Sequence, residues 1–339
     1  MPPTLPKLSY VLLSHNREKY IRAAIESAFA QDYEGELEYI FSDDCSTDRT
    51  FEIIKECVAA YKGNRRVVVT QTPRNLHLAG NTNHAVQFVE SDWIVRADDD
   101  DISTYNRCSL VGRAIAENPG CSFVYTLMQR FVDKLPQIAQ MQPDSHVTHL
   151  DILGGQSDMW TEFSKPNTLH QVWSTRHFKL FGPLPENGYW VDDVIANMRC
   201  CCFGYGIKIH QTTAYIRYNS GNMSQGLADG NRGYKAIIRL ENFNDRYHNT
   251  TLPPLLECFE AIKIFLRESG IQADSLISCI GKDIEERKLL CSFWRKGIVN
   301  RIRVSRKLRL HGLFNLLRCL PLPIYAGLLA AYRTLTGKA

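Results

Sequence analysis

The strongest constraint on the fold is an alternation of strand-like and helix-like segments between residues 8 and 103. The run LSYVLL (residues 8–13) is apolar and rich in β-forming residues, and EKYIRAAIESAFAQ (residues 18–31) then places apolar side chains at helical spacing. The same order, strand-like then helix-like, is repeated by LEYIFSDD and TFEIIKECVAAY and by RRVVVTQT and NLHLAGNTNHAVQFVE. A fourth strand-like segment, DWIVRADDDD, follows. This alternation predicts an α/β fold whose central sheet is mostly parallel and flanked by helices.

Polar residues follow three of these predicted strands. They are SHNR (residues 14–17), SDD (residues 42–44) and DDDD (residues 98–101). Ligand-binding loops of a parallel sheet gather at the carboxyl ends of its strands. We therefore expect the three clusters to lie along one edge of the sheet.

Residues 98–101 are four consecutive aspartates. Neighbouring like charges repel, so such a row calls for a positive partner. Hard divalent cations such as Mg²⁺ and Mn²⁺ bind carboxylate oxygens and keep positions open for substrate phosphates. A calcium-binding EF-hand loop does not fit, because Ile102 and Ser103 stand where further ligands and a glycine are required. A metal that bridges to a diphosphate is the better interpretation, and a solvated turn is the alternative.

Other phosphate-binding and metal-binding patterns are missing from the sequence. It has no GxxxxGK[ST] loop and no GxGxxG after a strand, so a nucleotide would be held through a metal and polar side chains. The 11 cysteines form no CxxC pair, which argues against structural zinc and a disulfide framework and favours a reducing cytosol. The histidines, His15 among them, form no pair at ligand spacing and are expected to be ordinary surface or core residues.

Four segments of the chain agree in order and spacing with the motifs of one known family. They are YVLLSHNREKYIRAAIESAFAQ, YIFSDDCSTDRTFEII, NLHLAGNTNHAV and WIVRADDDDIS. Over roughly residues 8–225 the chain thus resembles the family 2 glycosyltransferases with the GT-A fold. The resemblance implies that residues 98–100 are the DXD motif, whose outer carboxylates, Asp98 and Asp100, hold Mg²⁺ or Mn²⁺ on the diphosphate of a sugar nucleotide.

The resemblance also implies a set of residues that contact the nucleotide-sugar donor. Asp44 is expected to hydrogen-bond the nucleobase, with Ser14 and Asn16 lining the nucleoside pocket. The predicted donor contacts are Ser14, Asn16, Asp43, Asp44, Asn83, Arg96, Asp98 and Asp99. Helix capping and turn formation are the alternative role for Asp43 and Asp44, and Asp48 is expected to be such a cap.

A glycosyl transfer needs a base, because an acceptor hydroxyl is a poor nucleophile until its proton is removed. The segment YWVDDVIANMR resembles the family's ED motif, with Arg199 six positions after Asp193. The resemblance implies that Asp193 is the base, with Asp192 as the second candidate. The alternative is that the pair caps the following helix at its positive end, where a carboxylate is favoured anyway.

Two positions depart from the family pattern. Asn219 stands where the closing YRxHxxNxS segment more often has histidine, so a metal ligand would be weaker or missing there. His77 occupies the usual glycine of an NxG motif, which would alter the loop near the diphosphate. Neither departure removes the carboxylates.

The charge of the chain is unevenly distributed. The formal net charge is +4, and because twelve basic and no acidic residues follow Glu286, residues 1–286 carry 4 − 12 = −8. Residues 319–332, CLPLPIYAGLLAAY, are uncharged, but the segment is too short to span a bilayer. Together with the basic residues before it, this segment is expected to lie on an anionic membrane surface. A nucleic-acid patch and a solvated helix are the alternatives, and the first residues do not resemble a secretory signal.

The sequence therefore predicts a GT-A-type domain at residues 1–230 and a basic α-helical region at residues 231–339. Within the first domain, residues 1–103 would bind the donor and residues 104–230 the acceptor. The resemblance implies an inverting, metal-dependent enzyme that adds one sugar to a cell-surface glycan from the cytoplasmic face of the membrane, without nucleic acid as a partner. A nucleotidyltransferase of related fold and a catalytically degenerate nucleotide- or membrane-binding protein are the alternatives.

Overall fold

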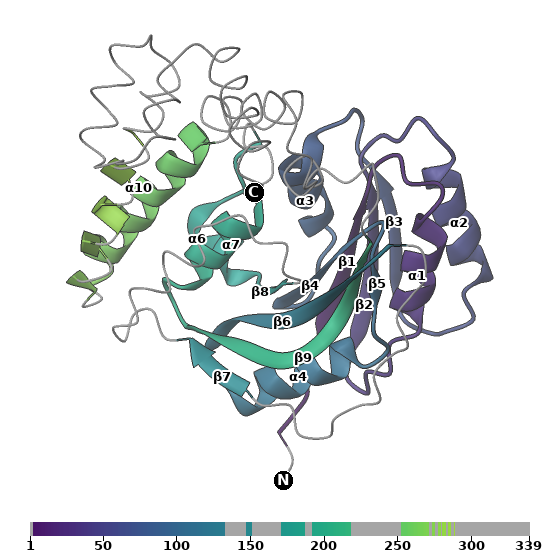
Figure 1. The fold of residues 1–339 in the computed structure, drawn as a ribbon, viewed down its shortest axis with the longest axis horizontal. Coiled ribbons are helices and arrows are strands. Elements are labelled where there is room, and N and C mark those ends of the chain that lie inside the picture. The colour runs from purple at the N-terminus through teal and green to yellow at the C-terminus, as the bar shows by residue number, and fades with distance from the viewer. Residues whose placement is uncertain are drawn as a thin grey trace, which may run out of the picture. The chain divides into compact units, whose positions relative to one another are not determined.

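The computed structural model describes residues 3–132, 147–150, 171–186, 192–217 and 252–270, together with scattered positions from 273 to 288. The chain divides into two compact units, residues 1–217 with 264–277, and residues 218–263 with 278–339. The central sheet belongs to the first unit (Figure 1). The predicted domain boundary at residue 230 lies outside the described residues.

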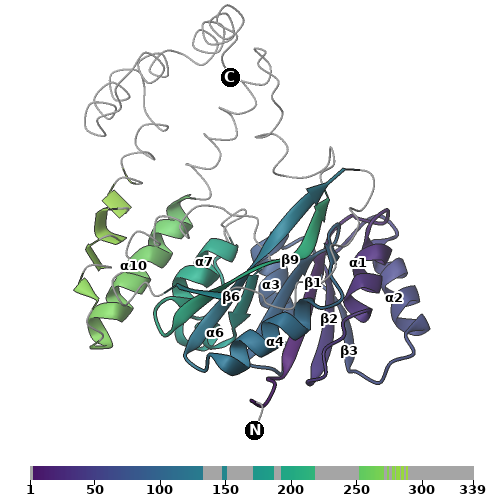
Figure 2. The ribbon, with the colours of Figure 1, turned by 60° about the horizontal axis from the view of Figure 1, so that its bottom comes forward.

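The first half of the sheet has the predicted parallel order. Its strands are β1 (Leu8–Ser14), β2 (Leu37–Asp43), β3 (Val67–Gln71) and β4 (Trp93–Asp98), and they pair in the order β3-β2-β1-β4. The connecting helices are α1 (Ile21–Phe29), α2 (Thr50–Ala60) and α3 (His77–Val86). Every residue of β1 and β2 is buried, as expected of strands covered on both faces. Helices α1 and α2 pack on one face and α3 on the other (Figures 1 and 2).

The second half of the sheet is mixed. It contains β5 (Ile102–Ser103), β6 (Cys121–Phe131), β7 (Val147–Leu150), β8 (Gln171–Ser174) and β9 (Tyr205–Arg217), with helices α4 (Arg107–Glu117), α6 (Arg176–Phe181) and α7 (Asp192–Cys200). Strand β8 runs antiparallel to both β4 and β6, and β9 is parallel to β6 but antiparallel to β5 and β7. The predicted α/β fold with a central sheet between helices is confirmed, but beyond β4 the sheet is mixed, with β6 and β9 as its one further parallel pair among the described residues.

Most of the predicted elements are present in the structure, and the omissions are strands. Strands β5, β7 and β9 were not predicted. Helix α10 (Leu252–Glu268) lies in the region 231–339 that was predicted to be α-helical. The uncharged segment 319–332 lies outside the described residues. Among the described residues, no helix has both the length and the apolar character needed to cross a bilayer.

Candidate active site

The loops at the carboxyl ends of β1, β2 and β4 are joined by hydrogen bonds, as the parallel order requires. The backbone N–H of His15 donates to Asp99 Oδ2 at 2.8 Å, which ties the β1 loop to the acid row, defined as Asp98, Asp99, Asp100 and Asp101. The backbone N–H of Asn16 donates to Ser46 Oγ at 2.8 Å, which ties the same loop to the one after β2. The expected gathering of polar clusters at one edge of the sheet is thus present.

His15 lies at this edge, as expected for the SHNR cluster, but it is not the ordinary surface or core residue that the sequence predicted. Its Nδ1 lies 2.8 Å from the Asp44 carbonyl oxygen, so Nδ1 is the protonated nitrogen. Its Nε2 then accepts from the amide groups of Asn16 at 3.1 Å and Asn75 at 3.0 Å. One imidazole therefore links the loops after β1, β2 and β3. Two of its partners, Asp44 and Asn75, lie far from it in the sequence, so this role could not be predicted from the residues around His15.

Asp43 and Asp44 are buried and engaged with the protein. Asp43 is fully buried and accepts from the Ser46 backbone N–H at 2.9 Å and from Gln71 Nε2 at 2.8 Å. Asp44 Oδ1 accepts from Thr72 Oγ1 and from a backbone N–H of the loop before α3, both at 2.8 Å. These contacts agree with the alternative role of the two residues in turn formation, and the nucleobase contact of Asp44 stays a prediction.

Ser14 and Asp48 complete this side of the edge. Ser14 is buried, and its hydroxyl donates to Asp43 Oδ1 at 3.3 Å. Asp48 Oδ1 accepts from the Thr50 backbone N–H at 2.9 Å and so satisfies an N–H of the first turn of α2, but the N-cap position of that helix is occupied by Arg49. Burial opposes ionisation of Asp48, but hydrogen bonds from Thr50 and from the Glu18 N–H outweigh it and lower its pKa.

Three residues near this edge adopt left-handed backbone conformations without being glycine. Asn16 and Cys45 have φ of 53°, and His77 has φ of 60°. They follow β1, β2 and β3 respectively, and a left-handed conformation costs on the order of 1 kcal/mol for a non-glycine residue. His77 is therefore at a position that favours glycine, which explains why an NxG motif would have glycine there.

Arginine side chains are the immediate partners of the acid row. Arg96 Nη2 and Nη1 lie 3.0 Å and 3.2 Å from the two carboxylate oxygens of Asp98. Arg17 Nε, from the loop after β1, lies 3.6 Å from Asp99 Oδ1 and 3.7 Å from Asp100 Oδ2. The positive charge that the row requires is thus supplied within the protein by Arg96 of β4 and by Arg17 of the loop after β1.

The fourth acid of the row is tied to the end of β9. The backbone N–H of Arg217 donates to Asp101 Oδ1 at 2.9 Å, and Arg217 Nε donates to the Asp100 carbonyl oxygen at 3.2 Å. The Arg217 guanidinium also lies over the rings of Tyr20 and Phe131, 4.8 Å and 4.5 Å from their centroids. This strand end leads into the segment with Asn219, which lies outside the described residues.

Burial makes two acids of the row, Asp99 and Asp101, costly to ionise. The pKa of Asp99 is raised well above its usual value by burial and by the adjacent charge of Asp100. Burial, with a contribution from Asp98, raises the pKa of Asp101 to about 8. A cation that binds between these carboxylates favours their charged forms, so cation binding is coupled to proton release at neutral pH.

The predicted base lies at the start of α7, which begins at Asp192. Asp193 Oδ1 accepts from the Val194 backbone N–H at 2.7 Å, while the side chain of Asp192 is not described. Arg199 donates to the carbonyl oxygens of Gly182 at 2.8 Å and Pro183 at 3.2 Å. The arginine of the motif therefore fixes the loop before α7.

Asn83 contacts this same loop. Its Nδ2 donates to the Leu184 carbonyl oxygen and its Oδ1 accepts from the Leu184 N–H, both at 2.8 Å. The amide that was predicted to bind the donor thus connects α3 to the loop between α6 and α7. A donor contact from Asn83 stays a prediction.

Comparison with known proteins gives the family. Residues 9–181, more than half of the chain, match the model of "Glycosyl transferase family 2". The chain belongs to this family. The matched segment contains β1–β4, the acid row and the strands as far as β8, so it includes the edge of the sheet described above.

Individual relatives match this family 2 chain over shorter stretches. It is 37% identical over 98 residues to "Putative glycosyltransferase EpsE" of Bacillus subtilis, covering 29% of this chain and 34% of that protein. It is 32% identical over 97 residues to "Poly(ribitol-phosphate) beta-N-acetylglucosaminyltransferase TarS" of Staphylococcus aureus, covering 28% of this chain and 16% of TarS. The chain thus spans about a third or less of the length of these two relatives.

A solved structure is similar in fold over most of the length of this chain. The structure of S. aureus TarS 1–349 in complex with UDP-GlcNAc has a TM-score of 0.55 and 18% identity, and covers 97% of this chain and 92% of that one. At this identity the likeness shows the fold, which agrees with the predicted GT-A type.

The donor set of the acid row fits a divalent ion that also binds substrate. Among the described residues, no group of three His, Cys, Asp or Glu side chains is arranged to hold a metal by itself. Mg²⁺ is commonly bound by one or two carboxylates together with substrate phosphates, and Asp98 and Asp100 can provide such a pair. The side chain of Asp98 is 37% exposed, so it is accessible to an ion.

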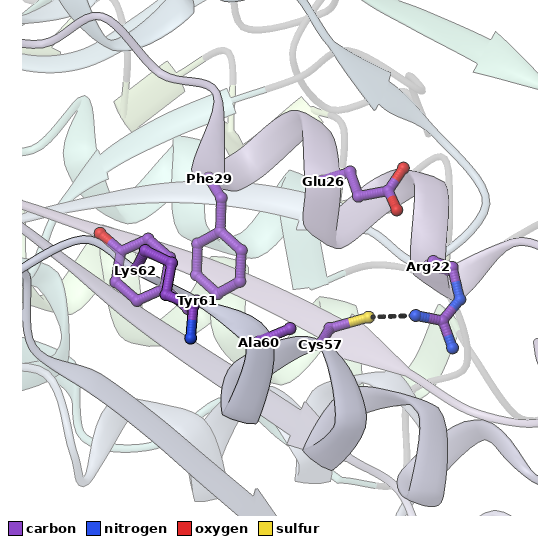
Figure 3. Close-up of a pocket in the computed structure, with 7 residues that line it drawn as sticks. All are labelled: Arg22, Glu26, Phe29, Cys57, Ala60, Tyr61 and Lys62. Atoms are coloured by element: carbon purple, nitrogen blue, oxygen red, sulfur yellow. Dashed lines mark hydrogen bonds between the residues drawn. The ribbon is translucent and has the colours of Figure 1, made fainter.

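A small hollow between α1 and α2 is a separate feature. It is lined by Arg22, Glu26, Phe29, Cys57, Ala60, Tyr61 and Lys62 (Figure 3). Arg22 Nη1 lies 3.4 Å from Cys57 Sγ across it. None of the predicted site residues lines this hollow, so it is not a candidate for the donor site.

Proposed function

We propose that this chain transfers one sugar from a nucleoside diphosphate donor to an acceptor hydroxyl, with inversion at the anomeric carbon. The observation that carries the proposal is the acid row, held at the edge of the sheet by the loop after β1 within a segment that matches glycosyl transferase family 2. This is the edge at which parallel sheets bind their ligands.

The donor would lie along the loops after β1, β2 and β4. Ser14, Asn16 and Asp44 would contact the nucleoside. Asp98 and Asp100 would hold Mg²⁺ or Mn²⁺, which supplies positive charge next to the diphosphate of the leaving group. Before such an ion binds, Asp98 must separate from Arg96, with which it is in direct contact.

Asp193 would act as the base for the acceptor. The bond from the anomeric carbon to the diphosphate oxygen breaks, and its electron pair stays on that oxygen. The acceptor oxygen forms the new bond from the opposite side, and its proton passes to Asp193. The position of Asp193 in the first turn of α7 supports the assignment, because a helix N-terminus holds a carboxylate in a fixed orientation.

The acceptor would be a cell-surface glycan, reached from the cytoplasmic face of the membrane. Two observations support this placement: a relative is named for sugar transfer to poly(ribitol-phosphate), and residues 287–339 carry twelve basic and no acidic side chains. In this proposal residues 1–103 bind the donor, residues 104–230 bind the acceptor, and residues 231–339 bind anionic lipid.

The experiment is a screen of UDP-, GDP- and dTDP-sugars with Mn²⁺, measuring release of the nucleoside diphosphate. Release of a nucleoside diphosphate is expected, whereas a nucleotidyltransferase acting on the same donors would release a sugar phosphate and transfer the nucleoside monophosphate to its acceptor. Asp100→Asn is expected to abolish metal-dependent donor binding, and Asp193→Asn is expected to keep donor binding and stop transfer. Equal losses of donor affinity in both variants would contradict this division of roles, and absence of both turnover and binding for all donors would overturn the proposal.

A further inference from the structure

Arg17 is held in place mainly by its backbone, and its side chain makes one hydrogen bond, from Nη1 to the Asn16 carbonyl oxygen at 3.2 Å. Its backbone N–H donates to Thr50 Oγ1 at 2.7 Å. The preceding residue, Asn16, has a left-handed backbone and accepts at Oδ1 from the Thr47 N–H at 2.8 Å. The loops after β1 and β2 therefore fix where the side chain begins. From there it extends toward the acid row.

The contacts of the Arg17 side chain with the acid row are long for ion pairs. Its Nε is 3.6 Å from Asp99 and 3.7 Å from Asp100, beyond the range of a hydrogen bond. This buried nitrogen has no hydrogen-bond partner among the described residues. The side chain is 27% exposed, compared with 12% for Arg96, whose contacts with Asp98 are within hydrogen-bonding distance. Arg17 is thus the more accessible cation at the acid row, and it has an unused donor.

A guanidinium in this position suits a diphosphate. Its planar array of N–H groups binds phosphate oxygens in pairs, and the cost of burying an unbonded N–H is removed when such an oxygen arrives. We propose that Arg17 binds the diphosphate of the donor and stabilises the negative charge that collects on it as the sugar leaves. This inference rests on the proposed function and adds a substrate-binding residue outside the acid row.

Titration calorimetry with the full chain in Mg²⁺ tests the assignment. The probes are UDP, GDP and dTDP, their matching monophosphates, and inorganic pyrophosphate. Arg17→Gln is expected to weaken binding of the diphosphates and of pyrophosphate by about ten-fold or more and to leave monophosphate binding unchanged. Arg17→Lys, which keeps the charge but loses the paired donors, is expected to fall between Arg17→Gln and the wild type. Arg49→Gln, an exposed arginine of the neighbouring loop, is the matched control and should bind like the wild type.

The outcomes separate the two proposals. If the wild type binds a diphosphate and Arg17→Gln binds it equally well, or loses monophosphate and diphosphate affinity together, the role of Arg17 is overturned while the proposed function stands. If the wild type binds none of the probes, the proposed function fails and the inference fails with it. A variant that unfolds at lower temperature but keeps the wild-type preference for diphosphates identifies Arg17 as a purely structural counter-ion and also overturns the inference.

Discussion

His177 in α6 gives a pH dependence of stability that can be worked out from the structure. Its ring is completely buried, 3.9 Å from the ring of Phe178 and 6.1 Å from that of Trp173, measured between centroids. Neither ring nitrogen has a hydrogen-bond partner among the described residues. Burial, with a smaller contribution from the charge of Arg199, lowers the pKa of His177 to about 3. The ring is therefore neutral in the folded protein at every pH above that value.

The sign of the effect follows from linkage. An unfolded chain binds a proton at this histidine below pH 6.5, whereas the folded chain does so only near pH 3. Stability is thus fully present above pH 6.5 and is lost as the pH falls toward 3, by about 1.4 kcal/mol for each pH unit. Between pH 7.5 and pH 5 the contribution of this one group is a loss of about 2 kcal/mol.

The variant His177→Leu removes the titration with little change in volume. Urea unfolding followed by tryptophan fluorescence at pH 7.5 and pH 5 should show the wild type losing about 2 kcal/mol more than the variant between the two pH values. His149→Gln, at an exposed position of β7, is the control and should lose as much as the wild type. An equal loss in wild type and His177→Leu would show that the ring is hydrated or hydrogen-bonded in the folded protein and would refute the reasoning.

Three further predictions concern other residues of the first unit. His77→Gly is expected to raise the melting temperature relative to His77→Ala, since only glycine removes a left-handed penalty on the order of 1 kcal/mol; equal values would argue against the strained backbone. Because the pKa of Asp101 is raised to about 8, the folded protein binds more protons than the unfolded chain between about pH 4 and pH 8, and wild-type stability therefore falls as the pH rises through this range. Asp101→Asn should make this fall smaller in thermal unfolding measured over a series of pH values. Glu38 is buried, accepts from the Glu90 N–H at 2.8 Å and pairs at 2.7 Å with the half-exposed Arg66, so Glu38→Ala should cost about 2–4 kcal/mol in chemical unfolding. Arg66→Ala should cost less, because Lys7 Nζ at 4.0 Å and the Glu90 N–H still compensate the buried carboxylate; equal costs would show that they do not.

The elements with local signals could be predicted from the sequence. The helices of the first half have a regular apolar spacing, and β1 and β2 are rich in apolar residues because both of their faces are covered. The position of the acid row followed from the rule that loops gather at the carboxyl ends of parallel strands.

The missed elements depend on distant parts of the chain. Strand β9 alternates irregularly between buried and partly exposed residues, since it pairs with β5, β6 and β7 at different points along its length. His15 and Arg17 lie in a recognised segment, but their partners belong to the loops after other strands, so their contacts could not be predicted from that segment. Asn83 was assigned to the donor from its motif, whereas its contacts with Leu184 arise only from the packing of α3 beside the loop before α7.

The central claim is that the acid row holds a divalent ion on a nucleoside diphosphate. A crystal structure of the protein with Mn²⁺ and the tightest-binding nucleoside diphosphate tests it most directly, because manganese is located by its anomalous scattering. The account predicts manganese bound to Asp98 and Asp100, with the diphosphate on the same ion and Asp98 released from Arg96. Manganese and nucleotide bound elsewhere, with the Arg96–Asp98 pair intact, would contradict it.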